Sequence, residues 1–285
     1  MSNTERPART RIAHEPRLRT LEVHAVSDLT AHLRRVTLTG PDLADFASAG
    51  PTDHVKLFLA DPATGLVHLP DASGGVTPEG GRSIRRDMTP RTFRAEGASG
   101  EPELDLDVVV HEQADTTPGP LAVWIENVRP GDAVSIAGPR GSKLVPEGFR
   151  RAVVAADETA LPAAARWLEL LDPDMDVLVL AEVQGPGEES YLDEVRPGAE
   201  VRWLHRGDAA PGASAVLAEA FAELGVIDDD TFVWVGGEAG SLIPVRHRLR
   251  RELGLPATQV EVQGYWRRGV GDYDHHAPID PSDPD

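Results

Sequence analysis

The texture of the chain changes near residue 147, and this change constrains the fold more than any other feature. Before it, short runs of alternating polar and apolar residues are separated by turn signals such as Gly40-Pro41 and Asp61-Pro62. After it, apolar runs alternate with stretches of helical spacing. A half-exposed antiparallel sheet alternates, whereas a parallel sheet covered by helices reads as continuous apolar runs. The sequence therefore predicts an all-β half followed by an α/β half.

The first half contains strand-like runs with no helical run among them, which predicts a small six-stranded antiparallel barrel. A segment rich in Gly, Pro and Ser interrupts these runs and predicts a mobile loop over residues 70–86. We expect the strands at 21–26, 32–40, 53–61, 91–97, 103–111 and 133–139.

The second half alternates strands with helices and predicts a doubly wound parallel sheet. Its first strand, 151–156, leads into a helix for which Asp157 suits the N-cap and Pro162 the first turn. The charges of the last helix, 242–253, are typical of a solvated face. The other expected strands are 176–183, 199–205, 231–237 and 259–266, and the other helix is 213–224.

These patterns divide the chain into four regions. We expect a flexible basic tail over residues 1–14, a barrel domain over 15–146 and an α/β domain over 147–267. Residues 268–285 are acidic and rich in Pro, and are expected to be a loose tail.

Composition excludes several functions. The chain has 47 acidic and 28 basic residues and a net charge of −19, so phosphate backbones repel it and nucleic-acid binding is not expected. It has no cysteine, which excludes disulfides, thiol nucleophiles and cysteine-ligated metal clusters. The first twenty residues lack an apolar signal core and no stretch approaches a membrane span, so we expect a cytoplasmic protein without membrane contact.

Two motifs of the barrel half have the chemistry to hold a phosphate, although each alone is more typical of an ordinary loop. Arg86 offers a charged fork and Thr89 a hydroxyl donor, and both can converge on one phosphate. Gly119 and Ala122 open a helical turn whose backbone N–H groups a pyrophosphate can approach. A third motif, residues 138–142, presents Arg140 to an anion or simply joins two domains.

Two motifs of the α/β half lie where such sheets bind ligands, outside the carboxyl ends of the strands, and a third lies near the end of the chain. Thr159 follows the first strand, although its acidic neighbours exclude a Walker loop. Gly237 and the residue before it follow the apolar run 231–235 and allow close approach of a ligand there. Tyr265 and Trp266 either cover a flat cofactor or plug the core.

The order of these motifs resembles that of the siderophore-interacting protein family, the flavin-dependent ferric-siderophore reductases of the ferredoxin-reductase-like superfamily. The resemblance spans residues 21–269, and its most specific stretches are DETALPAAARWLE, GEAG and GYWRRG. It implies a six-stranded Greek-key flavin-binding barrel over 15–146 and a doubly wound NAD(P)H-binding domain over 147–267.

The resemblance also implies non-covalent FAD as cofactor and NADPH or NADH as electron donor. Glu182 suits a ribose hydroxyl and NADH, whereas Arg206 suits a 2′-phosphate and NADPH, and the choice stays open. Met88 departs from the family pattern, which has Tyr there, so ring stacking at that position is in question. The implied cofactor-binding residues are Arg86, Met88, Thr89, Val109, His111, Gly119, Leu121, Ala122, Thr159, Gly237, Glu238 and Trp266.

The implied substrate is an anionic ferric siderophore, for which we expect Lys56, Arg140 and Arg267 to form a basic pocket. Electron transfer needs no acid–base side chain, so no catalytic residue is expected. No resident metal is expected either. We expect a monomer. Two alternatives stay open: a flavin reductase or diaphorase with another acceptor, and a siderophore-binding protein without redox activity, which would bind no flavin.

Overall fold

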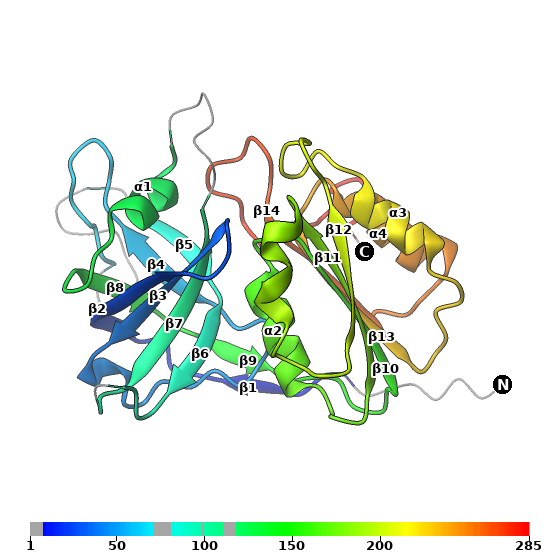
Figure 1. Ribbon diagram of the computed structural model, residues 1–285, viewed down its shortest axis with the longest axis horizontal. Helices are drawn as coiled ribbons and strands as arrows, with labels where there is room; N and C mark the ends of the chain where they lie inside the picture. Colours follow the sequence, from blue (N-terminus) through cyan, green and yellow to red (C-terminus); the bar gives the residue numbers. More distant parts are fainter. Residues whose placement is uncertain (1–7, 71–80, 82, 99, 111–117, 285) are drawn as a thin grey trace. The chain divides into compact units, whose positions relative to one another are not determined.

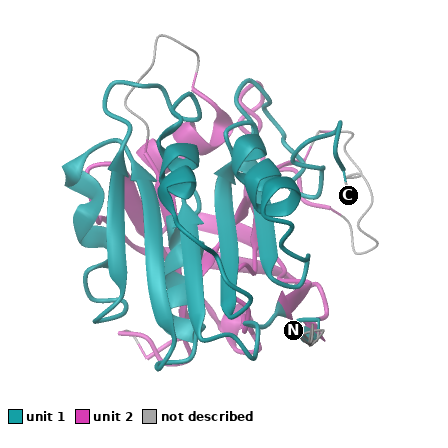
Figure 2. Ribbon diagram, turned by 90° about the vertical axis from the view of Figure 1, so that its right-hand side faces the viewer, with its two compact units in different colours: residues 1–11, 143–285 teal, residues 12–142 magenta. Residues whose placement is uncertain are grey.

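The computed structural model describes residues 8–70, 81, 83–98, 100–110 and 118–284 of the chain. The chain divides into two compact units, drawn in different colours in Figure 2. Unit 2 contains residues 12–142, and unit 1 contains residues 1–11 together with 143–285. The division falls close to the change of texture near residue 147. Two short strands, β1 (Arg11–Ala13) and β9 (Gly141–Lys143), pair with each other where the units divide.

Unit 2 is built on one curled antiparallel sheet in the order β5-β4-β8-β2-β3-β7-β6 (Figure 1). Its two outer strands, β5 and β6, are consecutive in the chain and are linked through Thr89. The two ends of the sheet are therefore held together by the chain, and the sheet curls around an apolar core. Its strands are β2 (Leu18–Asp28), β3 (Leu33–Thr39), β4 (Val55–Leu59), β5 (Ile84–Met88), β6 (Pro90–Arg94), β7 (Glu103–Val109) and β8 (Ala133–Ala137), and a 3-10 turn, η1, covers Pro41–Leu43.

Two elements of unit 2 correct the expectation from sequence. The sheet has seven strands rather than six, because the segment expected to be a loop over 70–86 runs into β5. Strand β5 is rich in charged residues and has no hydrophobic pattern that would predict a strand. It is stabilised because its backbone pairs with that of β4. A helix of eight residues, α1 (Pro120–Asn127), stands where the sequence predicted only a helical turn opened by Gly119 and Ala122. It is short and begins at a proline, so periodicity could not reveal it.

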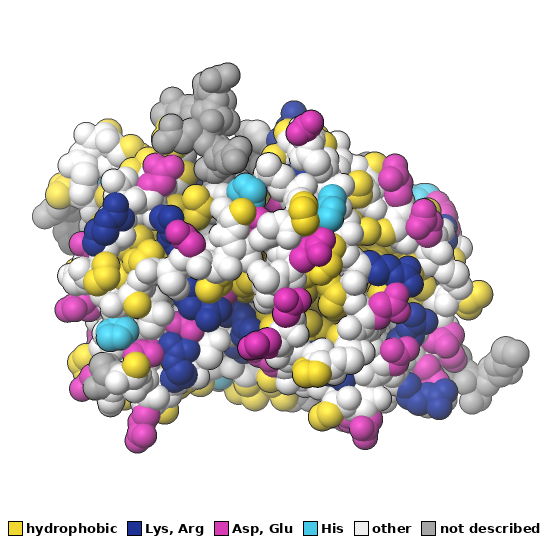
Figure 3. Space-filling model, viewed as in Figure 1, with side chains coloured by type: hydrophobic (Ala, Val, Ile, Leu, Met, Phe, Trp, Pro, Cys, Tyr) yellow, Lys and Arg dark blue, Asp and Glu magenta, His cyan; other side chains and the backbone are white. Residues whose placement is uncertain are grey.

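Strand β7 carries a row of buried carboxylates that basic side chains compensate. Asp105 and Glu103 accept hydrogen bonds from Arg94 at 2.6 and 2.9 Å, and Asp107 accepts one from Arg35 at 2.7 Å. Figure 3 shows basic side chains gathered over β6 and β7. Burial acts to raise the pKa of Asp105, but its hydrogen bonds, led by that from Arg94, hold the pKa below its usual value. This row is consistent with a structural role, since each carboxylate has a partner.

Unit 1 is built on a parallel sheet in the order β12-β11-β10-β13-β14. Helix α2 covers one face, and α3 and α4 cover the other (Figure 1). The predicted α/β half is therefore confirmed in its architecture. Its strands are β10 (Arg151–Ala156), β11 (Asp176–Val183), β12 (Glu200–His205), β13 (Thr231–Glu238) and β14 (Val260–Trp266). Its helices are α2 (Leu161–Leu170), α3 (Val216–Glu223) and α4 (Leu242–His247), with a 3-10 segment η2 (Pro186–Leu192) and a π-helical turn η3 (Arg248–Glu252).

The described parts of both tails correct the expectation that they are loose. In unit 1, Arg9 donates hydrogen bonds to the carbonyls of Lys143 and Leu144, pairs with Glu261 and lies 4.7 Å above the Trp167 ring. Each guanidinium nitrogen of Arg9 has a hydrogen-bonding or ion-pair partner, so burying this side chain costs little free energy.

The C-terminal segment is anchored in the same way. Ile279 is 7% exposed and belongs to the apolar core of unit 1, and Tyr273 packs against that core. Asp283 pairs with Arg246 and Arg251. The acidic and Pro-rich composition of this segment predicted a loose tail, but these contacts hold the segment against unit 1. In the part of the chain that the structure describes, no helix is long and apolar enough to cross a membrane.

Candidate functional site

The first group of predicted residues lies in unit 2, on strand β5 and the residue after it. Arg86 and Met88 share one face of the strand, whereas Arg85 and Asp87 are exposed on the other. Met88 is 8% exposed and is packed in the core of the curled sheet. Arg86 is half-buried beside it, and Thr89 follows directly. The Arg86 guanidinium and the Thr89 hydroxyl are the groups that could contact a ligand here, whereas the Met88 side chain is packed in the core.

The amino end of α1 is the second part of this group. The first intrahelical bond runs from Val123 N to Gly119 O at 3.0 Å, so the amides of Leu121 and Ala122 precede the helical ladder. Within the described residues, no side chain caps this end and the first turn holds no acidic residue. A Cβ atom at Gly119 would meet nothing within 4 Å. Such an end suits a phosphate group. Val109 closes β7, and His111, also predicted here, lies outside the described residues.

Two of the three predicted substrate residues also lie in unit 2. Lys56 on β4 stands opposite Asp87 on β5, and its ammonium is 2.7 Å from the carboxylate. The two side chains are 28% and 30% exposed. Arg140 is exposed at the end of the segment that follows β8. The sequence singled out Lys56 and not its partner, because 31 residues separate the two and only the strand register brings them together.

The second group lies in unit 1, at the carboxyl edge of the parallel sheet. Strands β11 and β12 lie on one side of β10, and β13 and β14 on the other, so the strand order reverses between β10 and β13. Ligands of open α/β sheets bind at such a reversal. Asp157 and Thr159 follow β10, and Gly237 and Glu238 end β13, so the structure brings these predicted residues together.

Asp157 is the centre of this edge. Its Oδ1 accepts hydrogen bonds from Thr159 N at 2.9 Å, Thr159 Oγ1 at 2.6 Å and Ala160 N at 3.3 Å. Its Oδ2 accepts one from Glu238 N and one from Trp266 Nε1, each at 2.9 Å. The expectation that Asp157 is the helix N-cap is wrong, because α2 begins later and its N-cap is Ala160. Asp157 instead ties the ends of β10, β13 and β14 together.

Gly237 and Glu238 pack tightly around this carboxylate. Gly237 has a φ of +155°, and a Cβ atom there would lie 2.9 Å from Asp157 Oδ2. Glu238 is 3% exposed, and its carboxylate accepts hydrogen bonds from Ser241 N at 2.6 Å and Arg268 N at 2.9 Å. The Glu238 carboxylate is therefore held by the protein. Arg267, the third predicted substrate residue, is half-buried directly after Trp266.

The two residues offered for nucleotide choice have partners of their own. Arg206, after β12, pairs with Glu158, whose carboxylate also accepts a hydrogen bond from Gln184 N at 2.8 Å. Glu182, near the end of β11, accepts a hydrogen bond from Ser214. The sequence does not reveal either pairing, because Glu158 and Ser214 are 48 and 32 residues away from the side chains they bind.

Burial raises the pKa of Glu182 to about 7; the hydrogen bond from Ser214 opposes this, and the charges of Asp157 and Glu158 add to it. The usual pKa is 4.5. Between pH 4.5 and about 7, Glu182 is ionised in the unfolded chain but still protonated in the folded one. The free energy of unfolding therefore falls as the pH rises through this range, and the full loss is present above about pH 7.

We therefore expect Glu182→Gln to raise the free energy of unfolding at pH 8 by up to about 3 kcal/mol and to leave it unchanged near pH 4. Urea unfolding at both pH values measures this. Glu189→Gln, at a side chain 42% exposed, is the control and should show no such dependence on pH. An equal gain at both pH values would contradict the assignment.

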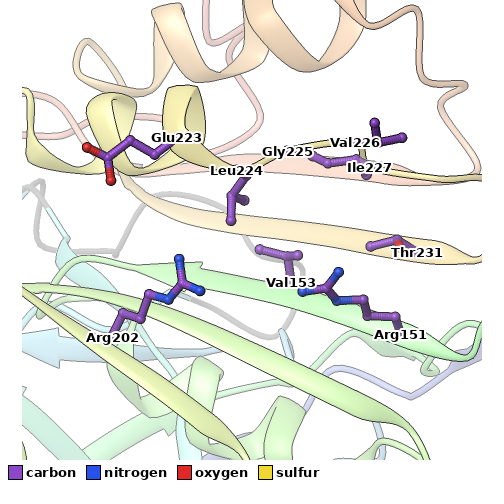
Figure 4. Close-up of a pocket in the computed structure, with 9 residues that line it drawn as sticks. All are labelled: Arg151, Val153, Arg202, Glu223, Leu224, Gly225, Val226, Ile227 and Thr231. Atoms are coloured by element: carbon purple, nitrogen blue, oxygen red, sulfur yellow. The ribbon is translucent and has the colours of Figure 1, made fainter.

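A small cavity in unit 1 is not part of this edge. It has a volume of about 160 Å³ and is lined by residues that include Arg151 and Thr231, the first residues of β10 and β13 (Figure 4). It therefore lies at the amino ends of these strands. Dinucleotide-sized ligands need roughly 300 Å³ or more, so this cavity is too small for one.

Comparisons with known proteins cover both units. The family profile described as "Siderophore-interacting FAD-binding domain" matches residues 22–143, and the profile described as "Siderophore-interacting protein" matches residues 149–269. An Escherichia coli K12 protein named NADPH-dependent ferric-chelate reductase is 31% identical over 270 residues, which cover 93% of this chain and 99% of that protein.

Two further relatives agree with these matches. The ferric vibriobactin reductase ViuB of Vibrio cholerae is 30% identical over 252 residues, which cover 87% of this chain and 89% of that protein. The crystal structure of a siderophore utilization protein from T. fusca has a TM-score of 0.84 and 39% identity, and the match covers 94% of this chain and 100% of that chain.

Proposed function

The chain belongs to the siderophore-interacting protein family, and from this membership we infer that it is a flavin-dependent ferric-siderophore reductase that uses FAD and takes its electrons from NADPH. One observation carries the inference. A siderophore-interacting FAD-binding profile and a siderophore-interacting protein profile match in succession, and a protein named NADPH-dependent ferric-chelate reductase aligns over nearly its full length.

The finer architecture follows as a proposal. We propose residues 15–146 as a Greek-key flavin-binding barrel and residues 147–267 as the domain that binds NADPH, followed by the C-terminal segment 268–285. The curled sheet of unit 2 and the doubly wound sheet of unit 1 support this division. We further propose that the protein acts as a monomer in the cytoplasm.

The residues of unit 2 fit FAD. Arg86 supplies a guanidinium for a phosphate and Thr89 a hydroxyl donor. The uncapped amides of Leu121 and Ala122, beside the open space at Gly119, suit the pyrophosphate. Val109 would border the flavin at the end of β7. Met88 offers no aromatic face and is packed in the apolar core, so it would not stack on the flavin.

The residues of unit 1 fit the nicotinamide nucleotide. Thr159, Gly237 and Glu238 lie at the reversal of strand order, and Asp157 holds Trp266 at the same edge. We propose Arg206 for the 2′-phosphate, with Glu158 orienting its guanidinium. When bound, FAD supplies the chemistry that takes a hydride from NADPH and passes on single electrons, so that one NADPH reduces two Fe(III) to two Fe(II) and yields NADP⁺ and one proton.

Substrate recognition is proposed for Lys56, Arg140 and Arg267. The net charge of −19 opposes an anionic ferric siderophore, so local cations must outweigh this field. The pairing of Lys56 with Asp87 keeps the ammonium in place on β4 while leaving it partly exposed to a ligand. The donors of these side chains bind and orient, and none moves a proton in the reaction.

Anaerobic reduction of an anionic ferric tricatecholate by the FAD-loaded protein tests this proposal, with NADPH as donor and a chelator that reports Fe(II). We expect Lys56→Ala to raise the KM for this substrate about 5- to 10-fold and to leave the KM for a neutral dye unchanged, since an exposed ion-pair contact contributes about 1 kcal/mol. Lys143→Ala is the matched control, because Lys143 is 31% exposed and pairs with Glu261 at 3.0 Å.

The outcomes separate the alternatives. An equal effect of Lys56→Ala on both acceptors would indicate a general diaphorase. A colourless protein that cannot be loaded with FAD would contradict the reductase assignment and indicate a protein that binds siderophores without reducing them.

A further inference from the structure

Three consecutive side chains in the C-terminal segment form a cluster of metal-ligating groups outside the proposed cofactor sites. One ligand atom from each of Asp274, His275 and His276 lies within 4.8 Å of the others. The two imidazole rings have centroids 3.9 Å apart and planes tilted by 43°. Two imidazoles and one carboxylate are the ligand set that non-haem Fe(II) and other divalent first-row ions accept, with coordination positions left for water.

The backbone of this turn is held in place without a metal. Ala277 N donates to Asp274 O at 2.8 Å, and His276 N donates to Asp274 Oδ1 at 2.9 Å. On either side, Tyr273 packs against the core of unit 1 and Ile279 is buried in it. Anchoring at both ends reduces the conformational entropy that three ligands lose on binding.

The position of the turn relates it to the carboxyl edge of the sheet in unit 1. A Cβ atom at Gly264 on β14 would lie 2.7 Å from Tyr273 Oη and 2.9 Å from the Ala239 side chain. The Tyr273 hydroxyl therefore packs against Gly264 near the carboxyl end of β14, and the cluster begins at the next residue. Residues 270–285 contain five aspartates and no Lys or Arg. Although Arg246 and Arg251 compensate Asp283, Asp272 and Asp274 place negative charge directly beside the two imidazoles, which favours a cation.

We propose that Asp274, His275 and His276 bind a divalent first-row transition-metal ion, and that this ion is the Fe(II) formed by the reductase. The second part rests on the proposed function. Imidazole nitrogen suits Fe(II), whereas Fe(III) in a siderophore favours hard oxygen donors, so the cluster discriminates in favour of the product. Binding here would hold the released ion before it leaves the protein.

Metal binding is tested on the FAD-loaded protein without NADPH or siderophore, by calorimetric titration with Co(II) and by anaerobic equilibrium dialysis with Fe(II). We expect one ion per chain, and an affinity at least about tenfold weaker in His275→Ala/His276→Ala. The double variant His205→Ala/His247→Ala is the matched control, because each of these exposed imidazoles also lies beside a glutamate, at 2.8 and 3.3 Å. It should bind as the wild type does.

Equal binding by the wild type and His275→Ala/His276→Ala, or no binding by the wild type, would overturn the site. Flavin content and circular dichroism establish that each variant is folded. With excess Fe(II) chelator, both proteins should reduce ferric siderophore at the same rate, so failure of the site and failure of the reductase are distinguishable. After turnover without chelator, the wild type should retain Fe(II) on gel filtration; its absence would overturn the assignment to Fe(II).

Discussion

Replacing Asp157 with alanine is expected to lower the free energy of unfolding by about 3–5 kcal/mol and to abolish turnover with NADPH. The carboxylate accepts five hydrogen bonds from donors at the ends of three strands. Alanine would leave the amides of Thr159 and Glu238 and the indole of Trp266 without this acceptor. Burial raises the pKa of Asp157 above its usual value, and the hydrogen bonds from Thr159 and Trp266 oppose this rise, so the donors reduce the cost of burying the carboxylate.

Urea unfolding of unliganded protein measures this prediction, with steady-state NADPH oxidation as the second readout. Trp266→Phe keeps the aromatic ring and removes one donor, so it should cost about 1 kcal/mol, as a single hydrogen bond does. The loss of unfolding free energy in Asp157→Asn should lie between those of Trp266→Phe and Asp157→Ala. The asparagine amide nitrogen cannot accept the hydrogen bonds that one carboxylate oxygen accepts. A loss below about 1 kcal/mol in Asp157→Ala would show that water or a rearranged turn replaces the carboxylate.

Replacing Arg86 with alanine is expected to weaken FAD binding about 30- to 150-fold, which corresponds to about 2–3 kcal/mol for a hydrogen bond to a charged group. Arg86 is half-buried on the face of β5 that carries Met88. A guanidinium in this position suits a phosphate that the negatively charged protein otherwise repels. The variant should therefore be purified with little flavin.

Arg85→Ala provides the matched control, because Arg85 is the neighbouring residue on the exposed face of the same strand. The backbone carbonyl of Arg85, which accepts a hydrogen bond from Arg86 at 2.7 Å, is kept in this control. Fluorescence titration of the apoprotein with FAD gives the dissociation constants. If both variants bind FAD equally, Arg86 does not contact the cofactor.

Much of the architecture was predictable because strands and helices each leave a characteristic period of apolar residues in the local sequence. The apolar run 151–156 became β10, and the helical spacing after it became α2. The sequence did not predict strand β5, and it predicted only the first turn of helix α1, for a physical reason. β5 is charged and gains its stability from pairing with β4, and α1 has too few turns to show a period.

The candidate site was predictable in part. Motif spacing placed Thr159, Gly237 and Trp266 at strand ends, and the topology brings them to one edge because the ends of parallel strands meet there. The role of Asp157 was misjudged, since a carboxylate before a helix usually caps it. Its actual partners include Glu238 N and Trp266 Nε1, which are 81 and 109 residues away.

Period and composition are properties of neighbouring residues, so the amino-acid order was sufficient for the two architectures, for the exclusion of thiol chemistry and for the family resemblance. The partner of each charge depends on strand register and packing, which act over long separations. Register places Lys56 opposite Asp87, and packing buries Ile279 and so anchors a segment whose composition is that of a loose tail. Buried groups acquire their electrostatics from such distant partners, which is why the partners of Glu182, Arg206 and Asp157 emerged with the folded chain.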